Sequence, residues 1–125
     1  MTSPGEVVAA FLTVAAKGEW DAALPMLADD VVYQNMMLPA VTGPAAVRET
    51  ADQLLSLCGG SEWVTHRQVE SGDLVMNERT DRFLIGGEWL DLPVAGVFEV
   101  RDGLIAAWRD YFDLQTVMTR AFPDA

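Results

Sequence analysis

The chain has 125 residues, half of them hydrophobic and 22% charged, a composition that is typical of a single folded domain and excludes a disordered chain. Its 19 acidic and 8 basic residues give a formal net charge of -11, which repels nucleic acid and anionic lipid alike. We therefore expect one domain over residues 1–125, with neither nucleic acid nor a membrane among its partners.

The N-terminal segment carries the start signals of a helix. Ser3, Pro4 and Glu6 supply an N-cap, a proline at the first helical position and the acidic residue of a capping box. The helix should run to about Lys17 and stop at Gly18. Its apolar run, VVAAFLTVAA, is too short to span a bilayer, and no Lys or Arg precedes it as a signal peptide would require. We expect a cytoplasmic protein.

Three further elements precede the C-terminal half of the chain. The segment WDAALPMLAD, residues 20–29, should form a short helix that kinks or ends at Pro25. A strand is expected over DDVVYQNM, residues 29–36, followed by the loop LPAVTGP. Pro44 should open a third helix that continues through AAVRETADQLLSLC and stops at a Gly-Gly pair. Because Cys58 is the single cysteine, the chain has no internal disulfide and no cysteine metal cluster, and packing alone must stabilise the fold.

From Ser61 onward the sequence alternates as strands do, interrupted by SGD, GGE and RDG, which are typical of hairpin turns. These strands should form an antiparallel meander, and a last short helix is expected over LQTVMTRAF, residues 114–122. Helices followed by hairpin-linked strands predict an α+β domain. In it, a curved antiparallel or mixed sheet should pack on the N-terminal helices and form a cone-shaped pocket.

Two of the expected strands carry charged residues on an otherwise apolar face. By the strand period of two, Arg79 and Asp81 share such a face in NERTDRF, and Asp110 lies between two aromatic residues in LIAAWRDYFD. The segment between them, WLDLPVAGVFEV, has an uninterrupted apolar face. If the strands are neighbours, the three charged residues form one buried cluster. Such a cluster survives only if its members satisfy one another, since an unpaired buried charge costs several kcal/mol.

The charges of this cluster can balance. The planar guanidinium of Arg79 can bond to both acids, and the sum is zero if Asp110 is ionised and Asp81 is protonated. On spacing alone, a structural or surface ion pair is the commoner explanation of such residues. Likewise, Tyr33 and Asn35, which share one face of the early strand, are explained by plain sheet packing with a surface amide.

The C-terminal half resembles a known enzyme family. NERTDRF, followed by LPVAGVFEVRDGLIAAWRDYFD, is similar to the limonene-1,2-epoxide hydrolase family, within the nuclear transport factor 2-like, or SnoaL-like, superfamily of cone-shaped α+β folds. That family uses a Tyr and an Asn two apart on an early strand, an Arg-x-Asp on a central strand, and an Asp in a Trp-Arg-Asp-Tyr-Phe segment. The resemblance covers almost the whole chain and implies five catalytic residues: Tyr33, Asn35, Arg79, Asp81 and Asp110.

The implied reaction is the addition of water to an epoxide in one step, which gives a vicinal diol. Asp110 would take a proton from a water that Tyr33 and Asn35 help to hold, and Asp81 would donate a proton to the epoxide oxygen. Arg79 would bridge the two acids. Burial and a like-charged neighbour raise the pKa of an aspartate, which would keep Asp81 protonated near neutrality. The reaction requires no metal and no organic cofactor.

The substrate implied is a small hydrophobic epoxide. Its apolar wall is expected from residues that share faces with the catalytic candidates or adjoin them: Met36, Phe83, Leu92, Val94 and Phe112. Some family members carry an extra N-terminal segment against the pocket, whereas this chain begins its first helix by residue 3 or 4, so substrate size does not follow from the resemblance. The resemblance also implies a homodimer through the sheet, for which Trp89 or Tyr111 on the outward face could serve.

Two alternative functions stay open. A ketosteroid isomerase or polyketide cyclase of the same fold would also set an aspartate in an apolar cone, but it would not need a second acid bridged by an arginine. A non-catalytic carrier of apolar small molecules belongs to a different class and would leave the charged cluster unexplained.

Overall fold

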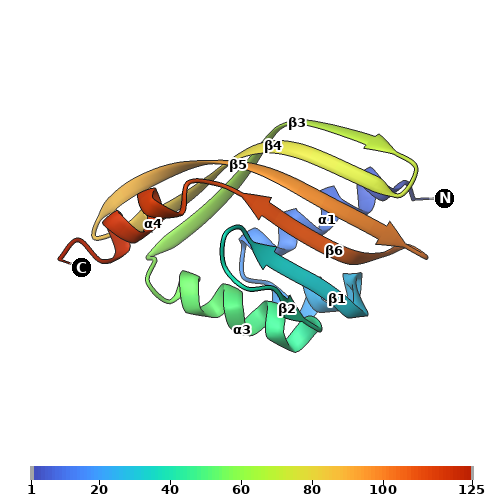
Figure 1. Ribbon diagram of the computed structural model, residues 1–125, viewed down its shortest axis with the longest axis horizontal. Coiled ribbons are helices and arrows are strands. Elements are labelled where there is room, and N and C mark those ends of the chain that lie inside the picture. Colours follow the sequence, from blue (N-terminus) through green and yellow to red (C-terminus); the bar gives the residue numbers. More distant parts are fainter. Residues whose placement is uncertain (1, 125) are drawn as a thin grey trace.

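The computed structural model describes residues 2–124, which form a curved sheet with helices packed against it (Figure 1). The helices are α1 (Pro4–Ala16), α2 (Trp20–Ala23), the 3-10 turn η1 (Leu24–Met26), α3 (Pro44–Leu55) and α4 (Leu114–Ala121). The strands are β1 (Leu27–Asn35), β2 (Val41–Thr42), β3 (Gly60–Ser71), β4 (Leu74–Ile85), β5 (Glu88–Arg101) and β6 (Leu104–Tyr111). The predicted α+β class and the predicted order of elements are confirmed.

The six strands form one mixed sheet in the order β2-β1-β6-β5-β4-β3. Strands β3 to β6 pair antiparallel with their neighbours along the chain, which confirms the predicted meander. Strand β1 pairs parallel with β6, and therefore the N-terminal part of the chain lies beside the C-terminal strand (Figure 1). This parallel contact makes the sheet mixed and places β1 beside the inward face of β6.

Helix α1 starts and ends as the sequence predicts. The Ser3 hydroxyl accepts a hydrogen bond from the Glu6 backbone N–H at 3.2 Å, and the Glu6 carboxylate accepts one from the Ser3 N–H at 3.2 Å. This capping box satisfies two backbone donors that the first turn would otherwise leave unpaired. The helix buries its apolar side, including Val8 and Phe11, against the sheet.

The second helix ends near Pro25, as the sequence predicts, because Pro25 lacks an N–H and turns the chain into η1. Other details differ from the prediction. Strand β1 begins at Leu27, earlier than expected. The two-residue strand β2 was not predicted, because its loop is too short to show alternation. Helix α3 ends at Leu55, and the next residues make short-range backbone bonds that tighten the last turn.

Strand β3 contains a β-bulge that reverses which side chains face inward. The pairing with β4 shifts between Thr65 and Arg67, which leaves His66 as the extra residue. Beyond the bulge, Arg67 bonds to the exposed Glu78 on the outer face, and Gln68 lies opposite the buried Asn77. A strict period of two would have turned Arg67 inward and Gln68 outward.

Trp108 lies at the centre of the larger hydrophobic core. Its ring packs edge-on against Phe11 with the ring centroids 5.1 Å apart, and stacks on Tyr33 at 4.1 Å and Phe98 at 5.9 Å. A smaller buried cluster from β4, β5 and α4 lies apart from this core and includes Phe83. None of the helices between residues 2 and 124 has both the length and the apolar character needed to cross a membrane.

Candidate active site

One inward-facing row of residues crosses five strands in register. It consists of Gln68 on β3, Asn77 on β4, Gly96 on β5, Asp110 on β6 and Asn35 on β1. Four of these residues carry amide or carboxyl groups on a face that is otherwise apolar. The exception is Gly96, which leaves a gap in the middle of the row.

This gap lets Arg79 reach across the sheet. Strands β4 and β6 are not neighbours, because β5 lies between them. The Arg79 side chain starts from β4 and passes over Gly96, where a Cβ would overlap its Nη1 and would lie only 2.7 Å from the Asn77 Oδ1. The apolar face expected on β5 is therefore interrupted at the one position where the cluster needs space.

Arg79, Asp81 and Asp110 are in direct contact. Arg79 donates from Nε to Asp81 Oδ1 at 3.1 Å and from Nη2 to Asp81 Oδ2 at 3.0 Å. The same Nη2 donates to Asp110 Oδ2 at 2.9 Å. The three residues are buried, with Arg79 only 1% exposed. The alternative of a surface ion pair is excluded by this burial.

The Asp110 side of the site is built on β1 and β6. Their parallel register places Asn35 opposite Asp110 and Tyr33 opposite Trp108. The Tyr33 hydroxyl donates to Asn35 Oδ1 at 3.2 Å. Trp108 Nε1 donates to Asp110 Oδ1 at 2.9 Å, so each Asp110 oxygen accepts one hydrogen bond from a buried donor. The structure thus brings together all five predicted catalytic residues.

Trp108 and Asn77 are site residues that sequence reasoning missed. Each lies two residues before a charged site residue on the same strand face, and each contacts that residue directly. This spacing is a usable signal, because an indole N–H or an amide two positions from a buried charge can satisfy it. The sequence analysis gave neither residue a role in the site.

Burial and charge set the protonation of the cluster. Burial alone would lower the pKa of Arg79, but the charge of Asp110 and the hydrogen bond with Asp81 raise it above its ordinary value, so Arg79 stays cationic. Burial raises the pKa of the Asp81 carboxyl, and the opposing contacts with Arg79 do not cancel that rise. Burial, with the charge of Asp110, also raises the pKa of Tyr33, whose hydroxyl stays neutral.

The two carboxyl groups face a cavity of about 270 Å³. Asp81 and Asp110 line it, whereas Arg79 is not among its lining residues and lies behind them. The rest of the wall is largely apolar and includes four of the five residues predicted to bind substrate: Phe83, Leu92, Val94 and Phe112. A hydrophobic molecule in this cavity would therefore contact two carboxyl groups, which the buried Arg79 joins on the side away from the cavity.

Met36, the fifth predicted wall residue, is not among the residues that line the cavity. Strand β1 ends at Asn35, and a turn closed by a hydrogen bond from the Leu38 N–H to the Asn35 carbonyl at 2.7 Å redirects the chain. Leu38 lines the cavity in place of Met36, because a strand period cannot be continued through a turn.

Two helices distant in the sequence supply wall residues that sequence reasoning missed. Helix α3 contributes Leu54 and Leu55, and α4 contributes Val117 and Met118. Local periodicity gave no sign of them, since an apolar helix residue looks the same whether it meets a core or a cavity. No group of three or more His, Cys, Asp and Glu side chains between residues 2 and 124 is arranged to hold a metal ion.

The family of the chain follows from comparison with known sequences. Residues 2–122 match the sequence profile of the limonene-1,2-epoxide hydrolase catalytic domain. The chain belongs to the limonene-1,2-epoxide hydrolase family. It is 40% identical over 109 residues to the epoxide hydrolase EphG of Mycobacterium tuberculosis, an alignment that covers 86% of this chain and 71% of EphG. The resemblance stated from the sequence is thereby confirmed, and the chain is an epoxide hydrolase of the limonene-1,2-epoxide hydrolase type.

Solved structures agree with this assignment. A limonene-1,2-epoxide hydrolase-like epoxide hydrolase of M. tuberculosis superposes with a TM-score of 0.81 and 32% identity, over 96% of this chain and 90% of that chain. A SnoaL-like protein from Jannaschia sp. superposes with a TM-score of 0.83 over 94% of this chain and 90% of that chain, at 20% identity. At this lower identity the likeness concerns the fold alone, and it confirms the predicted SnoaL-like architecture.

Proposed function

We propose that this epoxide hydrolase adds water to a small hydrophobic epoxide in one step, with Asp110 as the base and Asp81 as the acid. The observation that carries the proposal is that both carboxyl groups face one apolar cavity while Arg79 joins them from behind. An epoxide opens when a nucleophile attacks carbon and the ring oxygen gains a proton, so a base and an acid must act on the same molecule. This site provides both.

Asp110 and Asn35 hold the attacking water. A water between Asp110 and Asn35 would donate one hydrogen bond to the carboxylate and one to the amide oxygen, which leaves an oxygen lone pair directed into the cavity. The family resemblance implied that Tyr33 helps to hold this water. In the structure the Tyr33 hydroxyl donates to Asn35 Oδ1, so we assign it the role of orienting the amide. Fixing a nucleophile in its attacking direction can contribute several kcal/mol to catalysis.

Asp81 carries the proton that the epoxide oxygen needs. With Asp81 protonated, Asp110 ionised and Arg79 cationic, the buried cluster is neutral, and the raised pKa of Asp81 is consistent with this state. As the water oxygen bonds to carbon and the ring C–O bond breaks, Asp110 takes the water proton and Asp81 gives its proton to the epoxide oxygen. Both acids contact Arg79 Nη2. Return of the proton from Asp110 to Asp81, within this cluster or through bulk water, resets the site.

The experiment is diol formation from a cyclic alkene oxide by matched aspartate variants. Asp110→Asn keeps the size of the side chain but cannot act as a base, and we expect its kcat to fall by about a hundredfold or more. Asp91→Asn is the control, because Asp91 is an exposed residue on β5 that pairs with Arg82. If Asp110→Asn retains the wild-type rate, the base assignment is wrong.

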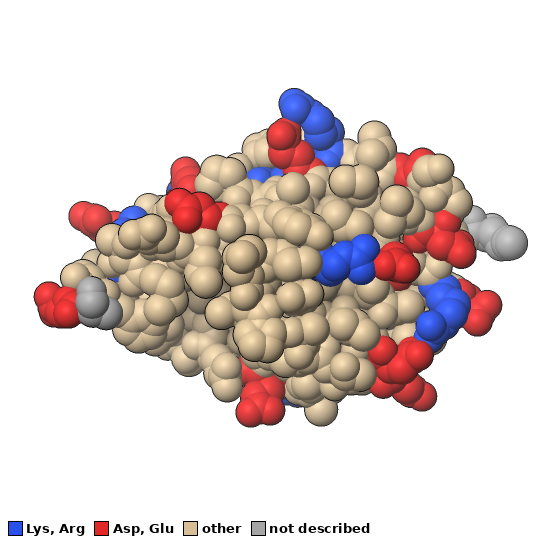
Figure 2. All heavy atoms as spheres, in the orientation of Figure 1, with Lys and Arg blue, Asp and Glu red and all other residues tan. Residues whose placement is uncertain are grey.

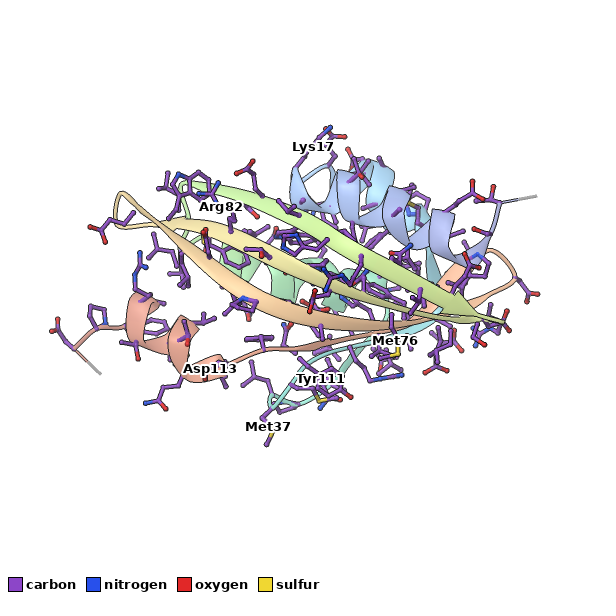
Figure 3. The ribbon with its side chains drawn as sticks, turned by 90° about the horizontal axis from the view of Figure 1, so that it is seen from above. Lys17, Met37, Met76, Arg82, Tyr111 and Asp113 are labelled. Atoms are coloured by element: carbon purple, nitrogen blue, oxygen red, sulfur yellow. The ribbon has the colours of Figure 1, made fainter. Side chains whose placement is uncertain are left out.

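We also propose a homodimer through the outer face of the sheet. Helix α1 lies behind the sheet in Figure 1, and the face toward the viewer shows a broad centre with few charged side chains in Figure 2. Met76 and Tyr111 project from β4 and β6 and are each 45% exposed (Figure 3). Light scattering that gives a monomer mass at micromolar concentration would remove this proposal. The cytoplasmic location stays a prediction, which fractionation of the native host would test.

A further inference from the structure

The guanidinium of Arg79 has a neighbour that the proposed reaction does not use. Arg79 Nη1 donates to Asn77 Oδ1 at 2.9 Å. Asn77 Nδ2 then donates to Gln68 Oε1 at 3.2 Å, and Gln68 Nε2 donates to the Gly5 carbonyl at 3.0 Å. These bonds form one continuous chain from the catalytic cluster to the first turn of α1.

The donor-to-acceptor direction of this hydrogen-bond chain is fixed at both ends. A guanidinium has only donors, so Asn77 must turn its oxygen toward Arg79. A backbone carbonyl has only acceptor sites, so Gln68 must turn its amide nitrogen toward Gly5. The two amides then meet with one donor and one acceptor between them. Each amide therefore has a single orientation that satisfies all its partners. The hydrogen-bond chain thereby holds the Asn77 oxygen toward Arg79.

The position of Gly5 favours the same contact. A Cβ on Gly5 would lie 3.1 Å from Gln68 Nε2 and closer still to the carboxylate of Glu70. The missing side chain lets β3 approach the helix backbone closely enough for Gln68 to reach the carbonyl. The β-bulge at His66 is the reason that Gln68 faces inward at all. Helix, bulge and strand together build a support for one arginine.

The support acts on the orientation of the guanidinium rather than on substrate. Asn77 is 5% exposed and is not among the residues that line the cavity. It holds the Nη1 corner, while Nε and Nη2 bond to the acids. Without an acceptor at Nη1, only the two acids hold the guanidinium, and a tilt about its paired bonds to Asp81 would move Nη2 away from Asp110. A neutral acceptor also leaves the charge balance of the cluster unchanged.

We infer that Asn77, supported by Gln68, is a positioning residue that keeps Arg79 Nη2 between Asp81 and Asp110 and so fixes the two acids relative to each other. The inference rests on the proposed function, because it assigns a purpose to the bridge between the two acids. Asn77 acts through Arg79 and touches neither substrate nor water.

Two substitutions at position 77 test this role. Asn77→Leu keeps the approximate volume and removes the acceptor, and we expect kcat to fall about tenfold to a hundredfold, the loss typical of a misplaced catalytic group, with KM changed less than about twofold. Asn77→Asp keeps an acceptor toward Arg79 and should retain more of kcat than Asn77→Leu. Its added negative charge favours the protonated form of Asp81, so the alkaline limb of its pH-rate profile should move to higher pH. Glu78→Gln, on the outer face, should match the wild type.

Gln68→Leu provides a second test that does not depend on whether Asn77→Leu folds. Gln68 lies on the edge strand β3, and its loss leaves the Asn77 amide free to turn, so we expect a smaller fall in kcat in the same direction. If both leucine variants fold, lower the melting temperature and keep the kcat and pH profile of the wild type, Asn77 is only structural and the inference is wrong.

Asp110→Asn is measured in parallel, to separate this inference from the proposed function. An active Asp110→Asn variant overturns the proposed function. An inactive Asp110→Asn variant, beside Asn77 and Gln68 variants with unchanged kcat, overturns this inference alone.

Discussion

Gly96 lies directly beneath the guanidinium of Arg79, and a Cβ at this position would overlap Arg79 Nη1. This contact explains how an arginine on β4 reaches an aspartate on β6 although β5 separates the two strands. The missing side chain at this position on β5 is what lets Arg79 join the two acids. The absence of a side chain is therefore part of the site.

Gly96→Ala should disable the enzyme. The added methyl group must displace the Arg79 guanidinium or distort Asn77 and Phe98, whose nearest atoms would lie 2.7 Å and 2.9 Å from it. We expect kcat to fall by about a hundredfold and the free energy of unfolding to fall by about 1–3 kcal/mol, as overpacked sites do. Steady-state kinetics and denaturant unfolding measure the two effects.

The control for this substitution is Gly59→Ala. A Cβ on Gly59 would meet Leu84 at 3.4 Å, which is ordinary van der Waals contact. This variant should keep the wild-type kcat. If Gly96→Ala is equally active, Arg79 does not need the gap, and the description of the site is wrong.

Trp108→Phe should leave Asp110 less well oriented while it keeps an aromatic ring in the core. Phenylalanine keeps an aromatic ring against Tyr33 but removes the Nε1 donor that contacts Asp110 at 2.9 Å. A buried carboxylate that loses a hydrogen bond loses about 1–3 kcal/mol of stabilisation and a fixed orientation. We expect kcat to fall about tenfold, which corresponds to about 1.4 kcal/mol in the barrier. Trp89→Phe, at an outer-face residue that is 41% exposed, should leave kcat unchanged.

The rate should fall with rising pH once Asp81 loses its proton. The raised pKa of Asp81 extends the pH range in which the acid is protonated, and the proposed mechanism needs that form. The measurement is kcat/KM against pH, which should show an alkaline limb that is absent in a variant without this acid. A rate that keeps rising through alkaline pH would mean that Asp81 is not the proton donor.

The same shift predicts how stability depends on pH. Because the folded-state pKa of Asp81 is raised above its unfolded value of about 3.9, the folded state holds this proton more tightly. Its contribution to stability is fully present below the unfolded pKa and is lost as pH rises through the folded pKa. The difference in unfolding free energy between wild type and Asp81→Asn should therefore decrease with rising pH, and a difference that increases over this range would reverse the assigned direction of the shift.

Local signals account for the parts of the fold that sequence predicted. The capping box at Ser3 and the hairpin turns at SGD, GGE and RDG act over a few residues, and the elements they bound were found. The strand β2 and the bulge at His66 were missed, because they depend on pairing with β1 and β4 rather than on their own residue patterns.

The site shows the same division. The strand period placed Arg79 and Asp81 on one inward face, and the family resemblance added Tyr33 and Asn35 beside Asp110. The function of Gly96, the chain through Asn77 and Gln68, and the cavity residues from α3 and α4 could not be predicted, because they depend on which segments meet in space.

The most direct test of the one-step mechanism is a single turnover in ¹⁸O-labelled water with the enzyme in excess over the epoxide. If Asp110 activates water for direct attack, every diol molecule from the first turnover carries one ¹⁸O atom on the attacked carbon. A first-turnover diol without label, with ¹⁸O appearing instead in the carboxylate of Asp110 or Asp81, would show a covalent ester intermediate and contradict the proposed mechanism.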